Sequence, residues 1–323
     1  MQQELQNLNS ELKEKIRSIP KRDQLLLKIK SKIGKIKVAK SLTDSEVKKL
    51  FNNKPLVGVD GSIYTYGANF PYNITFYKAL AKSTTQGNLE KNRIFTPLSD
   101  SCYTEIEQYA AENKISLEAA HSKLKEETLA TLEVEVAIQA IKEFGPRVLL
   151  MDGGFLRYGS LAPEKWQELK TLALQNDCIA VGVIEEIGTF EIKKILQDEL
   201  PLSCKNSYDR ELLFGLFSPG EWLQVYENLV LKRGYYTCFG RLALNPQACA
   251  WDFFEEHREY AEQIIDYLYT ITPRQSRGIP LWIDVVDSDV RLTKNMVELL
   301  LTSSLDPELM ELLLRPTRDK RDY

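Results

Sequence analysis

The chain has 323 residues, of which 43% are hydrophobic and 27% charged, and its formal net charge is −4. This composition is that of a globular protein with enough apolar residues for a sizeable core, in one large domain or two ordinary ones. There are 2 histidines and 5 cysteines, with no Cys-x-x-Cys pair and no apolar stretch of membrane-spanning length. We therefore expect no zinc site, no disulfide framework and no membrane segment, and, without a signal-peptide pattern at the start, a cytoplasmic protein.

The N-terminal part, residues 1–50, is predicted to be a basic helical extension. Residues 2–18 and 21–33 have helical character. Residues 11–40 carry eleven Lys or Arg against three Asp or Glu, a local charge of about +8 on an otherwise acidic chain. Such a segment is typical of contact with a polyanion, and a solvated helix explains it equally well. The side chains predicted to hold DNA phosphates here are those of Lys28, Lys30, Lys32, Lys35 and Lys37.

Residues 51–323 are predicted to form one α/β domain with a mixed central sheet flanked by helices. The expected strands are 56–60, 72–84, 147–152, 178–185, 235–244 and 280–286, with a polar loop over 86–100. The expected helices are 103–144 with a break near Lys114, 163–176, 190–199, 209–216, 219–227, 252–269, 290–301 and 306–314, followed by a charged tail. The first two strands are adjacent in the chain, so we expect them to form a hairpin.

Two of these strands share one pattern. In VGVDGS (57–62) and VLLMDGG (148–154) an apolar strand ends in an Asp, Asp60 or Asp152, and glycine follows. Asp is a poor strand former and is costly to bury, although a single Asp-Gly pair also marks an ordinary turn. Ligand sites in α/β sheets usually lie at strand ends. Two carboxylates on neighbouring strand ends repel each other, and a divalent cation offsets that repulsion.

A third acid is expected from the helix before the second of these strands. In ETLATLEVEVAIQAIKEF, Glu133 falls on the apolar helical face, whereas Glu135 lies on a more mixed face. This favours Glu133, with Glu135 as the second choice and a solvated helix glutamate as the simpler reading of either. Asp and Glu side chains around one or two Mn²⁺ or Mg²⁺ ions form a phosphoryl-transfer site that needs no histidine.

The order of these parts resembles the NurA nuclease family, whose fold is RNase H-like. The resemblance spans roughly residues 55–290, and the segments that carry it are VGVDGS (57–62), TLEVEVAIQAI (131–141), VLLMDGG (148–154) and YDRELLFGLFSPGEWL (208–223). It implies a Mn²⁺-dependent 5′-to-3′ DNA exonuclease and single-strand endonuclease, a homodimer that works with a HerA-like hexameric ATPase translocase in processing double-strand breaks. It also implies that the metal ligands are Asp60, Glu133 or Glu135, and Asp152.

The sequence departs from the family pattern at two places. Many members carry a Lys after the strand matching 178–185, where this chain has Glu185 and Glu186. Many have an Ala-His pair after the final strand, where this chain has Asp287. Asp287 is a further candidate ligand, although a capping role at a helix start is the simpler explanation. Arg157, just after the second Asp, is a candidate contact for the scissile phosphate.

The sequence therefore predicts a deoxyribonuclease that uses Mn²⁺ or Mg²⁺ and acts on single-stranded DNA and duplex ends. One alternative is a catalytically degenerate NurA-like subunit that binds DNA or a translocase, which the two departures motivate. Another is an actin-like ATPase, which also uses strand-end Asp-Gly turns. Such an ATPase needs glycine-rich phosphate loops, and the run after Asp60, SIYTYGANF, is too aromatic for one.

Overall fold

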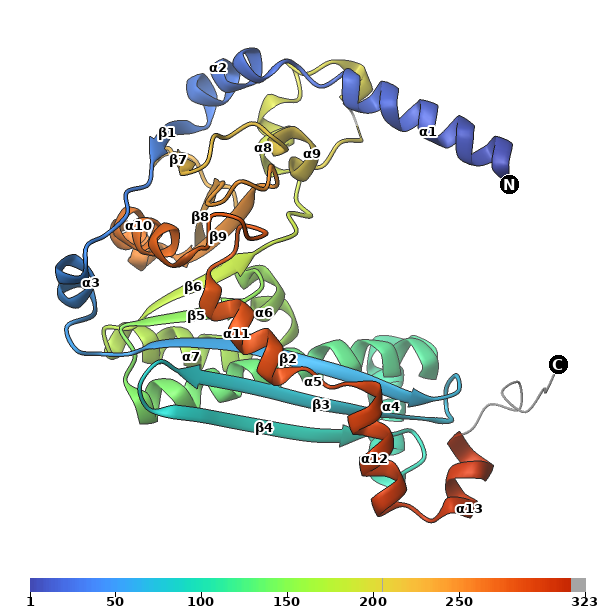
Figure 1. Cartoon of the computed structure of the whole chain (residues 1–323). Helices are drawn as coiled ribbons and strands as arrows, with labels where there is room; N and C mark the ends of the chain where they lie inside the picture. Colours follow the sequence, from blue (N-terminus) through green and yellow to red (C-terminus); the bar gives the residue numbers. More distant parts are fainter. Residues whose placement is uncertain (205, 315–323) are drawn as a thin grey trace. The chain divides into compact units, whose positions relative to one another are not determined.

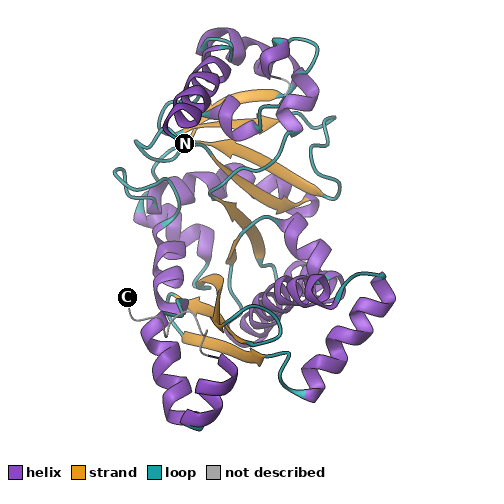
Figure 2. Ribbon diagram, turned by 90° about the vertical axis from the view of Figure 1, so that its right-hand side faces the viewer, coloured by secondary structure: helices purple, strands orange, loops and turns teal. Residues whose placement is uncertain are grey.

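The computed structural model describes residues 1–204 and 206–314, so the predicted charged tail lies outside the described residues. The chain divides into two compact units. Unit 1 comprises residues 1–53, 153–155 and 179–282, and unit 2 comprises residues 54–152, 156–178 and those from 283 onward. Helices and strands occur in both units (Figure 2). Among the described residues, no helix combines the length and apolar character that crossing a membrane requires.

The described residues of unit 2 include four strands in the order β5-β2-β3-β4, namely β2 (Leu56–Gly67), β3 (Asn73–Ser83), β4 (Gly87–Phe95) and β5 (Val148–Asp152). Strand β5 runs parallel to β2, and the other pairs are antiparallel. The predicted hairpin of β2 and β3 is confirmed. The polar loop expected over 86–100 is wrong, because residues 87–95 form β4. Its side chains are mostly polar because charged residues protect an edge strand from pairing with other chains.

The helices of unit 2 cover these strands. They are α4 (Asp100–Asn113), α5 (Leu117–Phe144), α6 (Phe155–Leu161), α7 (Pro163–Gln175), α11 (Leu281–Val290), α12 (Lys294–Ser304) and α13 (Pro307–Leu309), the last followed by a π-helical turn, Met310–Leu314. The long helix α5 runs beside β2 and β3 (Figure 1). The predicted break is confirmed, because Lys114 has a left-handed conformation between α4 and α5.

The final strand predicted over 280–286 is wrong, because these residues belong to α11. The buried positions of that helix are Ile283, Val286 and Val290, which recur at helical spacing. The run PLWIDVVD is short and rich in β-branched residues, so its composition favours a strand although its burial period is that of a helix. As a result Asp287 lies on a helix rather than after a strand.

In the part of unit 1 that the structure describes, five strands follow the order β1-β7-β8-β9-β6, and each is antiparallel to its neighbours within this unit. They are β1 (Gly34–Val38), β6 (Ile179–Ile184), β7 (Glu221–Val225), β8 (Tyr235–Gly240) and β9 (Cys249–Phe254). The helix predicted over 219–227 is wrong, as is the first part of the helix predicted over 252–269. All six residues of β9 are buried, so the strand shows no alternation that would reveal it in the sequence.

The helices of unit 1 are α1 (Gln2–Arg17), α2 (Arg22–Lys32), α3 (Asp44–Phe51), α8 (Glu191–Leu196), α9 (Asp209–Leu213) and α10 (Ala261–Ile271), with 3₁₀ turns at Leu202–Cys204 and Glu255–Tyr260. Helix α1 buries none of its residues and extends away from the other elements of this unit (Figure 1). The segments predicted to be helical over 2–18, 21–33, 190–199 and 209–216 each contain a helix, namely α1, α2, α8 and α9.

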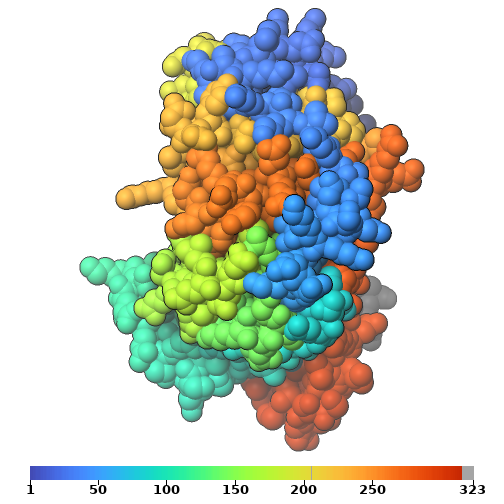
Figure 3. All heavy atoms as spheres, turned by 90° about the vertical axis from the view of Figure 1, so that its left-hand side faces the viewer, coloured from blue at the N-terminus to red at the C-terminus, as the bar shows by residue number. Residues whose placement is uncertain are grey.

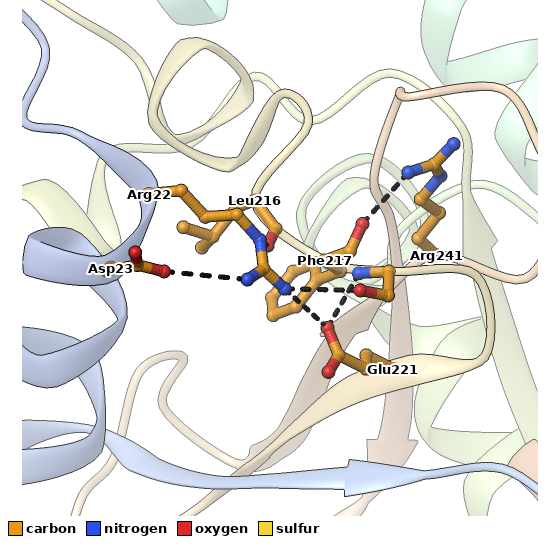
Figure 4. Close-up of polar contacts among 7 residues, drawn as sticks. Arg22, Asp23, Leu216, Phe217, Glu221 and Arg241 are labelled. Atoms are coloured by element: carbon orange, nitrogen blue, oxygen red, sulfur yellow. Dashed lines mark hydrogen bonds and ion pairs between the residues drawn. The ribbon is translucent and has the colours of Figure 1, made fainter.

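The N-terminal residues are built into unit 1. Strand β1 pairs with β7, and the Arg22 guanidinium donates to the Leu216 carbonyl (2.8 Å) and to Glu221 (3.1 Å) (Figure 4). Further along, the Phe51 ring packs against Tyr267 on α10, and in the space-filling view blue residues of the N-terminal part lie against orange residues from later in the chain (Figure 3). The predicted extension is therefore not wholly helical, and the boundary at residue 50 stays a prediction.

Candidate metal centre

The two predicted aspartates lie next to each other in the sheet of unit 2. Residues Leu56–Val59 pair in parallel with Val148–Met151, and the next residue on each strand is Asp60 or Asp152. Neighbouring strands are about 4.8 Å apart. Asp152 ends β5 as predicted, but Asp60 does not end β2, which continues beside β3 to Gly67. What ends at Asp60 is the pairing with β5.

The charge of Asp60 is poorly solvated and meets other carboxylates. The side chain is 7% exposed, and burial followed by repulsion from Asp152 raises the pKa of Asp60 to about 8. The Gly61 amide donates to Oδ1 at 2.7 Å and lowers this pKa, whereas Glu133 and Asp287 raise it further. Four acids therefore influence one another electrostatically, and we call Asp60, Glu133, Asp152 and Asp287 the carboxylate cluster.

Glu133 reaches this cluster from α5. The residue is 2% exposed, and burial raises the pKa of its carboxyl to about 7 although the adjacent Arg157 lowers it. The Arg157 guanidinium donates to Oε2 at 2.6 Å. A Cβ at Gly61 would lie 2.5 Å from Glu133 Oε1, so the glycine after Asp60 makes room for the glutamate beside β2.

Helix α6 supplies the groups that surround these acids. The fully buried Tyr158 donates its hydroxyl to the carbonyl of Asp152 at 2.8 Å, which fixes the end of β5. The Arg157 guanidinium lies over the Tyr158 ring, 5.0 Å from its centroid, and the Arg157 side chain keeps 34% of its surface exposed. Sequence reasoning missed Tyr158, because a tyrosine on a short helix carries no signal that separates it from an ordinary core residue.

The structure separates the remaining acidic candidates. Glu135 pairs with Lys91 of β4 at 2.8 Å, so α5 directs Glu133, and not Glu135, toward the aspartates. Asp287 pairs with Arg291, four residues later, at 2.9 Å. The negative charge of Asp287 also contributes to the raised pKa of Asp60.

The predicted phosphate-binding lysines of unit 1 are largely occupied by acids. Lys28 and Lys32 share Glu199, at 3.6 and 2.6 Å, and Lys37 pairs with a glutamate of α10. Within the described part of the chain, the lysines of this set that form no ion pair are Lys30 and Lys35. Both side chains are exposed, so within this set they are the lysines best placed to meet an anion.

A buried ion pair in unit 1 holds the turn that follows Asp152. Asp252 of β9 is 0% exposed and accepts hydrogen bonds from Lys232 Nζ (2.7 and 2.9 Å) and Thr237 Oγ1 (2.7 Å). It also accepts from the Phe155 amide at 3.0 Å, three residues after Asp152. We call Asp252, Lys232 and Thr237 the Asp252 network. Sequence reasoning missed it because the segment around Asp252 was predicted to be helical.

The carboxylate cluster suits a hard divalent cation in its donor chemistry. Its oxygens are those that Mg²⁺ and Mn²⁺ prefer, and burial followed by repulsion from Asp152 disfavours the charged form of Asp60, which a cation would stabilise. Among the described residues, no three His, Cys, Asp or Glu side chains stand close enough together to hold an ion as they are. One oxygen of Glu133 is bound by Arg157 instead.

The NurA domain family matches residues 25–292 of the sequence. The crystal structure of the NurA nuclease from Sulfolobus solfataricus is similar, with a TM-score of 0.54, 14% identity and 95% of each chain covered. The catalytic domain of human endonuclease V aligns at 16% identity and a TM-score of 0.39, covering 92% of this chain and 97% of that one. No curated protein matches the sequence. The predicted α/β fold of the RNase H-like nuclease type is confirmed, and the protein belongs to the NurA domain family.

Proposed function

We propose that this NurA-family protein is a metal-dependent DNA nuclease whose ion is held by Asp60, Glu133 and Asp152. The observation that carries the proposal is the parallel pairing of β2 and β5, which places Asp60 and Asp152 side by side where burial and repulsion between them raise the pKa of Asp60. Mn²⁺ or Mg²⁺ bound there would stabilise the ionised carboxylates that burial and mutual repulsion disfavour. Bound there, such an ion polarises a phosphodiester and makes water a stronger nucleophile.

The chain's own residues prepare this site in three ways. Gly61 leaves the space that lets the Glu133 carboxylate stand beside β2. Tyr158 holds the backbone of Asp152 at the end of β5. Arg157 places a guanidinium next to the carboxylates, where it is suited to a phosphate oxygen of the substrate.

The finer parts of the proposal come from the family resemblance. They are 5′-to-3′ exonuclease and single-strand endonuclease activity, a role at double-strand breaks, a homodimeric state and a HerA-like hexameric ATPase as partner. Exposed Lys30 and Lys35 are proposed contacts for DNA phosphates.

The test is cleavage of end-labelled single-stranded and duplex DNA in the presence of Mn²⁺, Mg²⁺ or EDTA. We expect cleavage with a divalent ion, none with EDTA, and loss of activity in Asp60→Asn, Glu133→Gln and Asp152→Asn. Glu135→Gln is the matched control, because it removes a neighbouring carboxylate of α5 that pairs with Lys91. Undiminished Mn²⁺-dependent cleavage by a variant with all three acids replaced would refute the proposal.

A second candidate function is that of a catalytically degenerate subunit that binds DNA or a translocase. The Glu133–Arg157 ion pair favours it, because a carboxylate already neutralised by a guanidinium is a poorer metal ligand. DNA binding by the purified chain without cleavage under any divalent ion would select this function. The ATPase alternative loses its support, since the chain belongs to the NurA family.

A further inference from the structure

The Glu133–Arg157 ion pair joins a buried acid to a partly exposed base. The Glu133 side chain is 3% exposed and the Arg157 side chain 34% exposed, and Nη1 lies 2.6 Å from Oε2. The carboxylate is fixed by its place on α5, whereas the guanidinium ends a long, flexible side chain that reaches solvent. If the pair opens, Arg157 is therefore the partner that moves.

The Arg157 guanidinium already occupies one oxygen of the Glu133 carboxylate, Oε2. Asp152 interacts electrostatically with both Glu133 and Arg157, so a change of charge at any one of these three groups affects the other two. A divalent ion bound to the Glu133 carboxylate would stand beside the guanidinium, and like charges at such short range repel strongly in a poorly solvated site. Burial raises the pKa of Glu133 and Arg157 lowers it, so Arg157 already gives the carboxylate form part of the stabilisation that a metal ion would give.

We propose that Arg157 is a resident cation that competes with the divalent metal for Glu133, so that metal binding requires Arg157 to release this carboxylate. This inference rests on the proposed function, because it concerns the same carboxylates. The free energy of opening the ion pair is subtracted from that of metal binding, so the pair weakens the metal affinity of the DNA-free protein. Release of Glu133 also frees a guanidinium beside the site, which couples metal binding to phosphate binding.

The experiment is a calorimetric titration of the DNA-free full chain with MnCl₂, comparing wild type with Arg157→Met. Every protein is titrated at the same pH, about 8, because Asp60 and Glu133, with pKa values of about 8 and about 7, bind protons that compete with the metal. We expect Arg157→Met to bind Mn²⁺ about tenfold more tightly, which corresponds to the opening of one ion pair. Arg157→Lys keeps the positive charge and should bind with nearly wild-type affinity.

The matched control is Lys91→Met. It removes an ion pair with Glu135 on the same helix, at 2.8 Å, and its cation has the same 34% exposed surface as Arg157. We expect the Mn²⁺ affinity of Lys91→Met to equal that of wild type. Equal or weaker Mn²⁺ binding by Arg157→Met would overturn the inference, since it would mean that Arg157 orients Glu133 for the metal or does not affect it.

Variants of the aspartates separate this inference from the proposed function. If Asp60→Asn and Asp152→Asn abolish Mn²⁺ binding while Arg157→Met leaves it unchanged, only the inference about Arg157 fails. If those two variants bind Mn²⁺ as wild type does, the proposed metal site itself fails. Arg157→Gln, which removes the charge but keeps hydrogen-bond donors, should also bind Mn²⁺ more tightly than wild type, and it tests the competition if Arg157→Met does not fold.

Discussion

Asp60 should make the metal-free protein less stable as the pH rises. Its pKa is about 8 in the folded chain against an ordinary value of 3.8, so between these values the folded state keeps a proton that the unfolded state has released. The stabilisation from this proton is complete below the unfolded pKa and is lost as the pH rises through the folded one. Four pKa units correspond to at most about 5 kcal/mol.

Asp60→Asn removes this titration, because an amide cannot ionise. With EDTA present, we expect the free energy of unfolding to fall from pH 5 to pH 9 by about 2 kcal/mol or more in wild type, and by less in the variant. Urea denaturation at both pH values measures the difference. Glu135→Gln serves as the control and should follow wild type. An identical pH dependence in Asp60→Asn would show that Asp60 is not the group responsible.

Gly61 should be irreplaceable for a steric reason. A Cβ at this position would lie 2.5 Å from Glu133 Oε1 and 2.8 Å from Leu129 Cδ1, so alanine must push α5 or the glutamate away from β2. We expect Gly61→Ala to cost about 1–3 kcal/mol of stability and to reduce Mn²⁺-dependent cleavage. Gly188→Ala is the control, because nothing lies within 4 Å of the added methyl group. Full cleavage activity in Gly61→Ala would contradict this account.

At the scale of residues, a functional side chain can be predicted from the sequence when its polarity does not suit the helix or strand that carries it. Asp60 stands out because an acid interrupts an apolar strand, and Glu133 because an acid lies on an apolar helical face. The structure brings these two together. Arg157 was predicted as a phosphate contact, but its pairing with Glu133 depends on how α6 packs against α5, which no local pattern encodes. The roles of these side chains stay predictions.

At the scale of elements, the Asp252 network should stabilise unit 1 and fix the turn after β5. Lys232→Met leaves Asp252 buried without its cation, and we expect a loss of about 3–5 kcal/mol. Adding Asp252→Asn removes the unpaired charge, so the double variant should be more stable than Lys232→Met alone. Thermal and urea unfolding of the three proteins measure this. A double variant that is less stable than the single one would contradict the assignment.

Helices and strands were predictable where the spacing of their buried residues and their amino-acid composition favoured the same kind of element. The α5 helix and strands β2 and β5 satisfy both criteria. Strand β9 was missed because its uniform burial removes the alternation, and α11 because valine, isoleucine and tryptophan favour strands. In these segments the tertiary environment outweighs local propensity, so only the surrounding structure reveals the element.

At the scale of the whole molecule, the N-terminal residues offer less positive charge to an anion than their sequence indicates. The segment 11–40 carries about +8, yet acids distant in the chain neutralise several of its lysines. Glu199 pairs with two of them. Their partners lie more than 150 residues away, so the composition of the segment alone overstates the surface that an anion would meet.

This difference predicts which lysines contribute to DNA binding. Each phosphate contact releases counterions, so removing one contact lowers the slope of log K against log salt by about 0.9 for duplex DNA. With EDTA present to prevent cleavage, we expect Lys30→Ala with Lys35→Ala to lower the slope by about 2. Lys28→Ala with Lys32→Ala removes the same charge but frees Glu199 from two partners, and should lower it less. Equal slopes in the two double variants would show that the ion pairs with Glu199 open when DNA binds.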